Sequence, residues 1–424
     1  MYNIQSRTAA GPAPAAVLAV RAPVCGPAHQ NESEVKYLGY TKPNKGRRKW
    51  PWVALGCVAA ALLLVVAVAW HLYSQVAEVF EPGAAGTLNQ STDPNIEANG
   101  ERFYNLLVLG IDYDEEDGAR TYAEGKGMTD VIMYVQVDRD TNKINVLQIP
   151  RDTYYGDTMA GGVTAYECKI NEVYANGPDQ ENLINNLANE IYELYKLPID
   201  NYVTIEMDAF KTLLNNMGGI DMYVPWDIIL KDQATGKEEL LVPQGEHHIN
   251  GDIAELILRN RNYAQADYKR LETQQYFYAA VVDYFLNECD LAGYYNNCRT
   301  VAHYLNTDLD ITEIWGLYAT MTKVEPEDIY IVRSPGGPLD VTRPREPDGR
   351  KASVYYTDRD AMAELLNEHF RDPEMPVAAE KLGLPTGFDW PLGKNIDPGR
   401  TLGDVDASIQ QAQSDADSGA SSAG

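Results

Sequence analysis

The feature that most constrains this chain is a run of 21 residues without a formal charge, Trp50–Trp70. As an α-helix it would span roughly 31 Å, the thickness of a bilayer core. Tryptophans and Tyr73 mark its two ends, as in the aromatic belts of membrane proteins. A cleaved signal peptide is a poorer explanation, because the run is long and no small-x-small cleavage site follows it closely. We therefore expect one retained transmembrane helix over residues 50–73.

Charge is divided unevenly along the sequence. Residues 1–73 carry eight Lys or Arg and two acids, a net of +6, so residues 74–424 carry −33 to give the chain's total of −27. The positive-inside rule places residues 1–49, a disordered head that ends in the basic cluster Lys42–Lys49, in the cytoplasm and the rest outside the cell. The acidic outer part argues against nucleic acid as a partner.

Three segments follow the membrane run. Residues 74–102 have the Gly, Asn and Pro content of a linker. Residues 103–372 alternate apolar runs of strand and helix length, and we predict one extracellular domain with a C-terminal helical extension. Residues 373–424 are dominated by Pro, Gly, Ser, Ala and Asp, and we expect them to be mostly disordered.

Strands and helices alternate in the predicted domain. A turn signal, DRDTNK, separates two of the strands and predicts a hairpin. This order predicts an α/β fold with a mixed central β-sheet covered by helices on both faces. The predicted strands are 103–112, 131–138, 144–150, 202–205 and 220–224, the helices are 181–195, 208–217, 251–258 and 266–287, and further elements are 311–321, 328–332 and 358–370.

The segment VLQIPRDTYY, Val146–Tyr155, is the first candidate functional element. An apolar run that ends in Pro150 and continues into Arg151 and Asp152 predicts a buried strand presenting two charges at its carboxyl end, where open α/β sheets bind ligands. A turn with a surface ion pair explains the same residues more simply, so this segment needs support from its neighbours.

Further basic residues are placed to converge with Arg151. Arg259 and Arg261 are two residues apart and so share a side of an extended segment. Arg270 and Gln274 share a helix face, with Asp267 one turn earlier. Together with Lys169, these groups could bind one phosphate-bearing anion, since the guanidinium fork suits phosphate oxygens.

Two acids lie at strand ends that face the same region. Asp112 directly follows LLVLGI, and Asp130 directly precedes VIMYVQV. A pair of carboxylates is what Mg²⁺ typically takes from a protein, with water and phosphate oxygens as its other ligands. The pattern predicts phosphoryl chemistry. A network of structural ion pairs would produce the same pattern, and spacing alone leaves both interpretations open.

These residues lie in segments that together resemble the LytR-CpsA-Psr (LCP) family of Gram-positive cell envelopes. The resemblance covers roughly residues 103–288, in order and at the family's spacing. The matching segments are NLLVLGID (105–112), MTDVIMYVQVD (128–138), INVLQIPRDTYY (144–155), KINEVYANG (169–177), residues 199–225, HHINGDIAELILRNRN (247–262) and DYKRLETQQ (267–275).

The resemblance implies an extracytoplasmic, membrane-anchored phosphotransferase. Such an enzyme moves a glycopolymer (wall teichoic acid, capsular polysaccharide or similar) from a polyprenyl-pyrophosphate carrier to peptidoglycan. Carried over by position, Asp112 and Asp130 would hold Mg²⁺ or Mn²⁺, and Asp152 would orient Arg151. Asp267 is our candidate for activating the acceptor hydroxyl, from its register with Arg270. The implied pyrophosphate-binding and catalytic groups are Arg151, Lys169, Arg259, Arg261, Arg270 and Gln274.

Four positions depart from the family pattern. Met128 and Thr273 stand where arginines are usual, Asp114 replaces an arginine after the first aspartate, and Asn262 replaces a frequent histidine. These departures leave two alternatives to the transferase. One is a catalytically weak protein that binds lipid-linked polymer or wall glycan, and the other is a polyprenyl-pyrophosphate hydrolase.

Overall fold

The computed structural model describes residues 88, 90, 102–112, 127–231, 236–259, 266–284, 287, 305–346, 348–388 and 397–422. All of them belong to one compact unit, residues 65–424. The predicted cytoplasmic head and the predicted membrane segment at 50–73 lie outside these residues. Among the described helices, none has the length and apolar character needed to cross a membrane.

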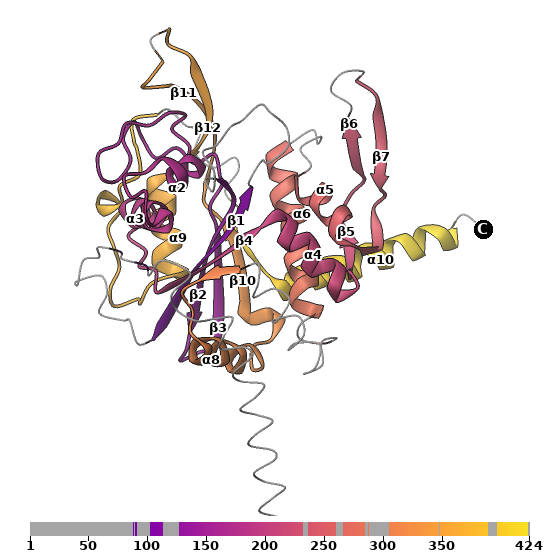
Figure 1. The fold of residues 1–424 in the computed structure, drawn as a ribbon. Helices are drawn as coiled ribbons and strands as arrows, with labels where there is room; N and C mark the ends of the chain where they lie inside the picture. Colours follow the sequence, from indigo (N-terminus) through magenta and orange to yellow (C-terminus); the bar gives the residue numbers. More distant parts are fainter. Residues whose placement is uncertain are drawn as a thin grey trace, which may run out of the picture. The chain divides into compact units, whose positions relative to one another are not determined.

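A seven-stranded mixed sheet forms the centre of the domain (Figure 1). Four of its strands, β1, β3, β4 and β10, run in the same direction, while β2, β9 and β13 run against them. The order is β13 (Arg400–Thr401), β10 (Ile329–Arg333), β3 (Lys143–Gln148), β2 (Met128–Asp138), β1 (Phe103–Asp112), β4 (Asn201–Glu206) and β9 (Leu305–Thr307).

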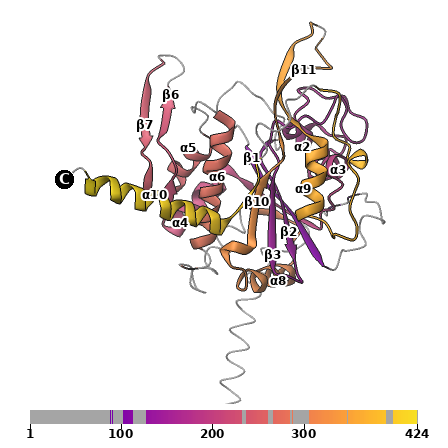
Figure 2. The ribbon, with the colours of Figure 1, turned by 180° about the vertical axis from the view of Figure 1, so that it is seen from behind.

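Helices cover both faces of this sheet, as predicted, and the two views in Figures 1 and 2 agree on the layers. The two faces bury separate apolar cores, because side chains alternate across a strand. One face packs against α2 (Val173–Asn176), α3 (Leu183–Tyr195) and α9 (Arg359–His369). The other packs against α4 (Met207–Met217), α5 (Gly251–Arg259), α6 (Ala266–Asp283), α8 (Ile311–Met321) and α10 (Leu402–Ser422).

Three two-stranded sheets complete the fold. They pair β5 (Ile220–Val224) with β8 (Gly245–Ile249), β6 (Ile228–Lys231) with β7 (Glu238–Val242), and β11 (Gly336–Thr342) with β12 (Lys351–Thr357). In both ribbon views the β6–β7 and β11–β12 hairpins project from the same end of the molecule, beyond the carboxyl ends of the parallel strands (Figure 1).

The C-terminal segment differs from the expectation that residues 373–424 are mostly disordered. Residues Leu402–Ser422 form helix α10. Its first turns carry Leu402 and Val405, both buried, and Ile409 packs against the same core. The spacing of three and four residues gives this otherwise polar segment one apolar stripe, which composition alone concealed.

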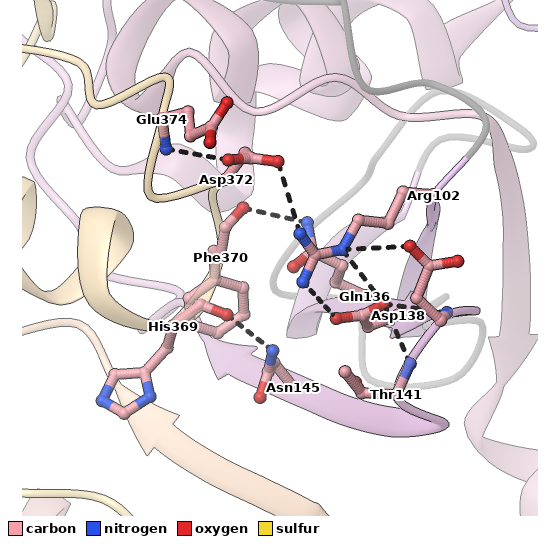
Figure 3. Close-up of polar contacts among 10 residues, drawn as sticks. Arg102, Gln136, Asp138, Thr141, Asn145, His369, Phe370, Asp372 and Glu374 are labelled. Atoms are coloured by element: carbon pink, nitrogen blue, oxygen red, sulfur yellow. Dashed lines mark hydrogen bonds and ion pairs between the residues drawn. The ribbon is translucent and has the colours of Figure 1, made fainter.

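An arginine fixes the point at which the chain enters the sheet. Arg102 donates from Nη2 to Asp138 of β2 at 2.8 Å and from Nη1 to Asp372 at 3.3 Å (Figure 3). Asp138 also accepts the backbone N–H groups of Asp140 and Thr141 in the β2–β3 turn. One cation therefore joins the start of β1, the hairpin turn and the segment after α9.

Two amide side chains extend this network to the end of α9. Gln136 donates to the carbonyl of Phe370 at 3.0 Å, and Asn145 donates to the carbonyl of His369 at 2.6 Å (Figure 3). These bonds satisfy carbonyls that a helix terminus leaves without helical partners. They fix α9 to the amino-end edge of the sheet.

A buried acid on α3 holds the loop that precedes the KINEVYANG segment. Glu190 is 2% exposed and accepts the backbone N–H of Ala160 at 2.6 Å. Burial raises its pKa to about 7, against the effect of that hydrogen bond. Because an unfolded chain would ionise Glu190 near its ordinary pKa, ionisation favours unfolding between these two values, and stability falls as pH rises through that window.

We predict that Glu190→Gln stabilises the domain at pH 8 and has little effect at pH 4.5. The raised pKa corresponds to a gain of at most about 3 kcal/mol at the higher pH. Urea unfolding at both pH values measures it, with the exposed Glu181→Gln as control. An equal effect of Glu190→Gln at both pH values would contradict this account.

Candidate functional site

The candidate site begins where β3 ends. Ile149 is buried, and a turn follows in which Thr153 donates both its N–H (2.9 Å) and its hydroxyl (2.6 Å) to the carbonyl of Pro150. Proline presets one backbone torsion of such a turn and continues no ladder. The turn ends the strand abruptly and places Arg151 and Asp152 at the carboxyl edge of the sheet, as predicted from the sequence.

Arg151 forms an ion pair with Asp130 of the neighbouring strand β2. Asp130 lies at an irregularity in the β1–β2 ladder, where Gly110 pairs with Val131 but Ile111 pairs with Thr129. Bulges of this kind redirect a side chain at the end of a strand. A Cβ on Gly110 would lie 3.0 Å from Cβ of Val131, so the close approach at this point favours glycine.

Asp152 and Lys169 form a second ion pair beside the first. Lys169 Nζ lies 3.0 Å from Asp152 Oδ1, and Arg151 Nε lies 4.0 Å from the same oxygen. Backbone hydrogen bonds bring the two segments together, because the N–H of Ile170 donates to the carbonyl of Thr153 and the N–H of Asn171 donates to that of Arg151. Two acids and two bases thus alternate at the strand end.

A buried carboxylate, which sequence reasoning missed, braces this pairing. Glu172 is 1% exposed and accepts the Tyr155 hydroxyl at 2.7 Å together with the backbone N–H groups of Tyr166, Glu167 and Cys168. A buried charge is tolerated only when hydrogen bonds satisfy it. Its position inside KINEVYANG, three residues after Lys169, was the available signal.

Arg151 keeps donor capacity that its ion pairs do not use. About one fifth of its side chain is exposed, and among the described residues only its Nη1 makes a hydrogen bond, to Asp130, while the buried Nε lies 4.0 Å from Asp152 Oδ1. A guanidinium carries five N–H donors in a fixed fork. Arg151 is therefore built to donate to a further anion at this edge.

Helix α6 lies over the same strand end. Gln275 donates from Nε2 to Oε1 of Gln148, the last residue of β3, at 3.3 Å. Its neighbour Gln274 is buried and donates to the carbonyl of Leu258 in α5 at 3.3 Å. Gln274 therefore joins the two helices that carry the other predicted site residues, and its contact with substrate stays a prediction.

The backbone brings several of those residues to this region. Arg259 directly follows Leu258 at the end of α5, and Asp267 and Arg270 lie in the first turns of α6, before Gln274. The side chains of Arg259, Asp267 and Arg270 lie outside the description, as does Arg261 altogether. Of the positions that depart from the family pattern, Thr273 is fully buried and donates to the carbonyl of Lys269.

The predicted metal residues lie on adjacent strands. Asp112 is the last residue of β1 and pairs through its backbone with Met128, two residues before Asp130. Among the described side chains, which do not include Asp112, no three Asp, Glu, His or Cys residues gather as a metal site. Asp130, near the start of β2, is a carboxylate of the kind that Mg²⁺ binds, and Mg²⁺ needs only one or two protein ligands beside water and phosphate.

Sequence reasoning also missed a second arginine at this edge. Arg333 ends β10, is 4% exposed, and pairs through its Cα position with Gln148. Its guanidinium lies 5.9 Å from the centroid of the Tyr355 ring. An arginine that ends the apolar run IYIV was the available signal.

Comparison with known proteins identifies two similar transferases among others. A polyisoprenyl-teichoic acid–peptidoglycan teichoic acid transferase, TagV of Bacillus subtilis, is 27% identical over 284 residues, which cover 65% of this chain and 69% of the relative. TagU of Oceanobacillus iheyensis, named for the same activity, is 24% identical over 64% of this chain and 81% of its own.

Solved structures give matches of the same kind. The crystal structure of B. subtilis TagV matches with a TM-score of 0.49 at 24% identity, over 63% of this chain and 97% of the other. A structure described as TagT bound to LI-WTA matches with a TM-score of 0.45 at 18% identity, over 72% of this chain and 99% of the other.

The model of the LytR_cpsA_psr family matches residues 68–371. This range contains the whole carboxyl-edge site and every segment that carried the resemblance in the sequence. The chain belongs to the LytR_cpsA_psr family.

Proposed function

We propose that this protein is a membrane-anchored phosphotransferase that moves a glycopolymer from a polyprenyl-pyrophosphate carrier to peptidoglycan. Family membership and the transferase names of its relatives support this activity. The relatives are named for teichoic acid, which makes an anionic polymer of this class the first substrate to test. Anchoring by residues 50–73, with the domain outside the cell, belongs to the proposal and rests on the sequence.

The observation that carries the proposal is the state of Arg151 at the strand end. It is held by Asp130 and by a hydrogen-bonded turn, and its partly exposed guanidinium keeps N–H donors beyond the one that Asp130 accepts. Lys169 lies beside it through their common neighbour Asp152. A pyrophosphate needs several such donors when it leaves water. In the proposal, Arg259, Arg261, Arg270 and Gln274 complete the binding site.

Mg²⁺, or Mn²⁺, would be held by Asp112 and Asp130 and would neutralise charge on the pyrophosphate oxygens. Asp130 suits this role because Arg151 pairs with only one of its oxygens, while the other has no hydrogen-bond partner among the described residues.

The proposed reaction balances without a nucleotide. An acceptor hydroxyl oxygen bonds to the phosphorus that carries the sugar, and the bond from that phosphorus to the bridging oxygen breaks. Polyprenyl phosphate leaves with the bridging oxygen, and the hydroxyl proton passes to a base, for which Asp267 is our candidate. Arg151 and Lys169 would bind the oxygens on which negative charge develops, as preorganised donors do in phosphoryl transfer.

We predict that Arg151→Ala lowers kcat/KM about 100-fold or more, because it removes a preorganised donor. Arg151→Lys should recover only part of this loss, since an ammonium cannot donate as a planar fork. The assay follows polyprenyl phosphate released by the full chain from a polyprenyl-pyrophosphate glycan in the presence of peptidoglycan oligomers.

The control for Arg151 is Arg350→Ala, which removes an exposed arginine paired with Asp348. This variant should turn over as the unchanged protein does. Full turnover by Arg151→Ala would overturn the proposed site. Donor binding without turnover by the unchanged chain would instead favour a binding protein, and release without transfer would favour a hydrolase.

A second prediction separates the metal from the ion pairs. Asp130→Asn should raise the Mg²⁺ concentration for half-maximal activity about tenfold or more, because a neutral amide is a weaker ligand for a hard cation. Asp152→Asn removes a partner of Arg151 and Lys169 without touching the proposed metal ligands. It should lower turnover and leave the Mg²⁺ dependence unchanged. The same metal dependence in both variants would contradict the assignment of Asp130.

A further inference from the structure

We propose that helix α8 (Ile311–Met321) is a second membrane contact, which lies on the outer surface of the bilayer through an uncharged aromatic face. The inference rests on the anchoring part of the proposed function and adds to it the orientation of the domain. The face consists of Thr312, Trp315, Gly316 and Ala319, all exposed.

The four exposed residues share one side of the helix, since they follow the spacing i, i+3, i+4, i+7. The opposite side of α8, with Ile314, Leu317 and Met321, packs against the core. Trp315 is 49% exposed, and its ring meets that of Tyr318 edge to face with centroids 5.8 Å apart. Among the described residues, Trp315 is one of four large apolar side chains that are exposed.

Charge is nearly absent from this helix, although the chain as a whole carries −27. Glu313 is its one charged residue, and its carboxylate accepts the N–H of Asp310 in a capping box that starts the helix. The exposed face therefore offers no charge that would need to leave water. Tryptophan and tyrosine favour the headgroup level of a bilayer, where an apolar ring and a polar N–H or O–H are both accommodated.

The position of the helix in the chain supports a lipid surface as its occupant. Leu88 donates its N–H to Asp308 at 3.4 Å, two residues before the N-cap of α8. Gln90 donates to the carbonyl of Ala188 on α3 and accepts the N–H of Ile199, which holds it near the amino end of β4, and Leu88 packs on the core of the α3 face. Leu88 and Gln90, the first described residues after the predicted membrane segment, thus lie at the end of the sheet where α8 begins.

The length of the linking chain keeps the start of α8 near the predicted membrane segment. Residues 71–87 separate Trp70, the end of the uncharged run, from Leu88, which makes eighteen steps from Cα to Cα. Fully extended they would span at most about 60 Å, and a flexible chain of that length averages about 25 Å. The start of α8 is therefore tethered within a domain diameter of the bilayer.

The position of α8 on the sheet determines how far the membrane contact would lie from the candidate site. Strand β9 leads into α8 and runs antiparallel to β4, with Thr307 opposite Val203, so α8 lies at the edge where β4 and β1 begin. Tyr104 of β1 donates to Asn201, which donates to Glu313 of α8. Both ribbon views place α8 at the end of the sheet away from the β11–β12 hairpin (Figure 2).

The carboxyl edge with Arg151 lies a strand length away, roughly 30 Å for the ten residues of β1. A domain resting on α8 would hold its site above the membrane and directed away from it. The donor's lipid would then have to leave the bilayer for its pyrophosphate to reach Arg151.

The experiment uses the full chain reconstituted in phosphatidylcholine vesicles, either plain or brominated near the top of the acyl chains. The emission of Trp315 is obtained by subtracting the spectrum of Trp315→Phe from that of the unchanged protein. The emission of Trp226 is obtained in the same way from Trp226→Phe, and its ring lies against Lys269 of α6. We expect bromine to remove about half or more of the Trp315 emission and to leave the Trp226 emission unchanged.

The outcomes separate the contact from the anchor. If the protein floats with the vesicles and Trp315 emits equally in both kinds, the anchor stands and the α8 contact is overturned. If the protein does not float with vesicles, the anchoring part of the proposed function fails and the α8 contact fails with it. Neither flotation nor tryptophan quenching depends on transferase activity. A failure of the proposed activity is therefore measured separately, in the turnover assay.

Discussion

The ion pair between Arg151 and Asp130 is the interaction on which the candidate site depends. It joins the ends of two antiparallel strands, and each partner is placed by a local irregularity, a proline turn after β3 and a bulge in β2. The desolvation of such a pair offsets much of its attraction, so it contributes little to stability by itself. Its value lies in holding a partly exposed guanidinium at a fixed place, with N–H donors that Asp130 does not use.

Hydrogen bonds in the surrounding structure hold the segments next to Arg151 in position. Glu172 gathers four donors and thereby holds the segment that supplies Lys169. Gln275 fixes α6 to the last residue of β3, and Gln274 fixes α6 to α5. These polar groups are buried, and in a protein interior the loss of a hydrogen-bond partner is costly. Stability and positioning thus rest on the same bonds.

Much of the fold follows from the sequence. The apolar runs at 103–112, 220–224 and 251–258 correspond to β1, β5 and α5 within one residue, because strong periodicity and clear turn signals bound them. Helix α10 escaped prediction, since its three apolar contacts are diluted among Asp, Ser, Gln and Ala. Its order comes from a tertiary contact that a local pattern does not contain.

The candidate site was predicted in part. Arg151 and Asp152 lie at the carboxyl end of a buried strand, as predicted, and Asp130 and Lys169 lie beside them. Their ion pairs match the structural interpretation that the sequence left open beside the functional one, and their roles in binding stay predictions. Glu172 and Arg333 were missed, since a buried charge is recognisable only from the groups that surround it. The roles of Asp112, Arg259, Arg261, Asp267 and Arg270 remain predictions from sequence and backbone position.

The most direct test of the central claim follows the phosphorus atom that carries the sugar. The full chain is given a donor radiolabelled at that phosphorus, with peptidoglycan oligomers and Mg²⁺, and the label is traced after one turnover. A phosphotransferase places the label on the peptidoglycan and releases unlabelled polyprenyl phosphate. Label that stays with the carrier, or that appears only as soluble glycan phosphate, would contradict the account.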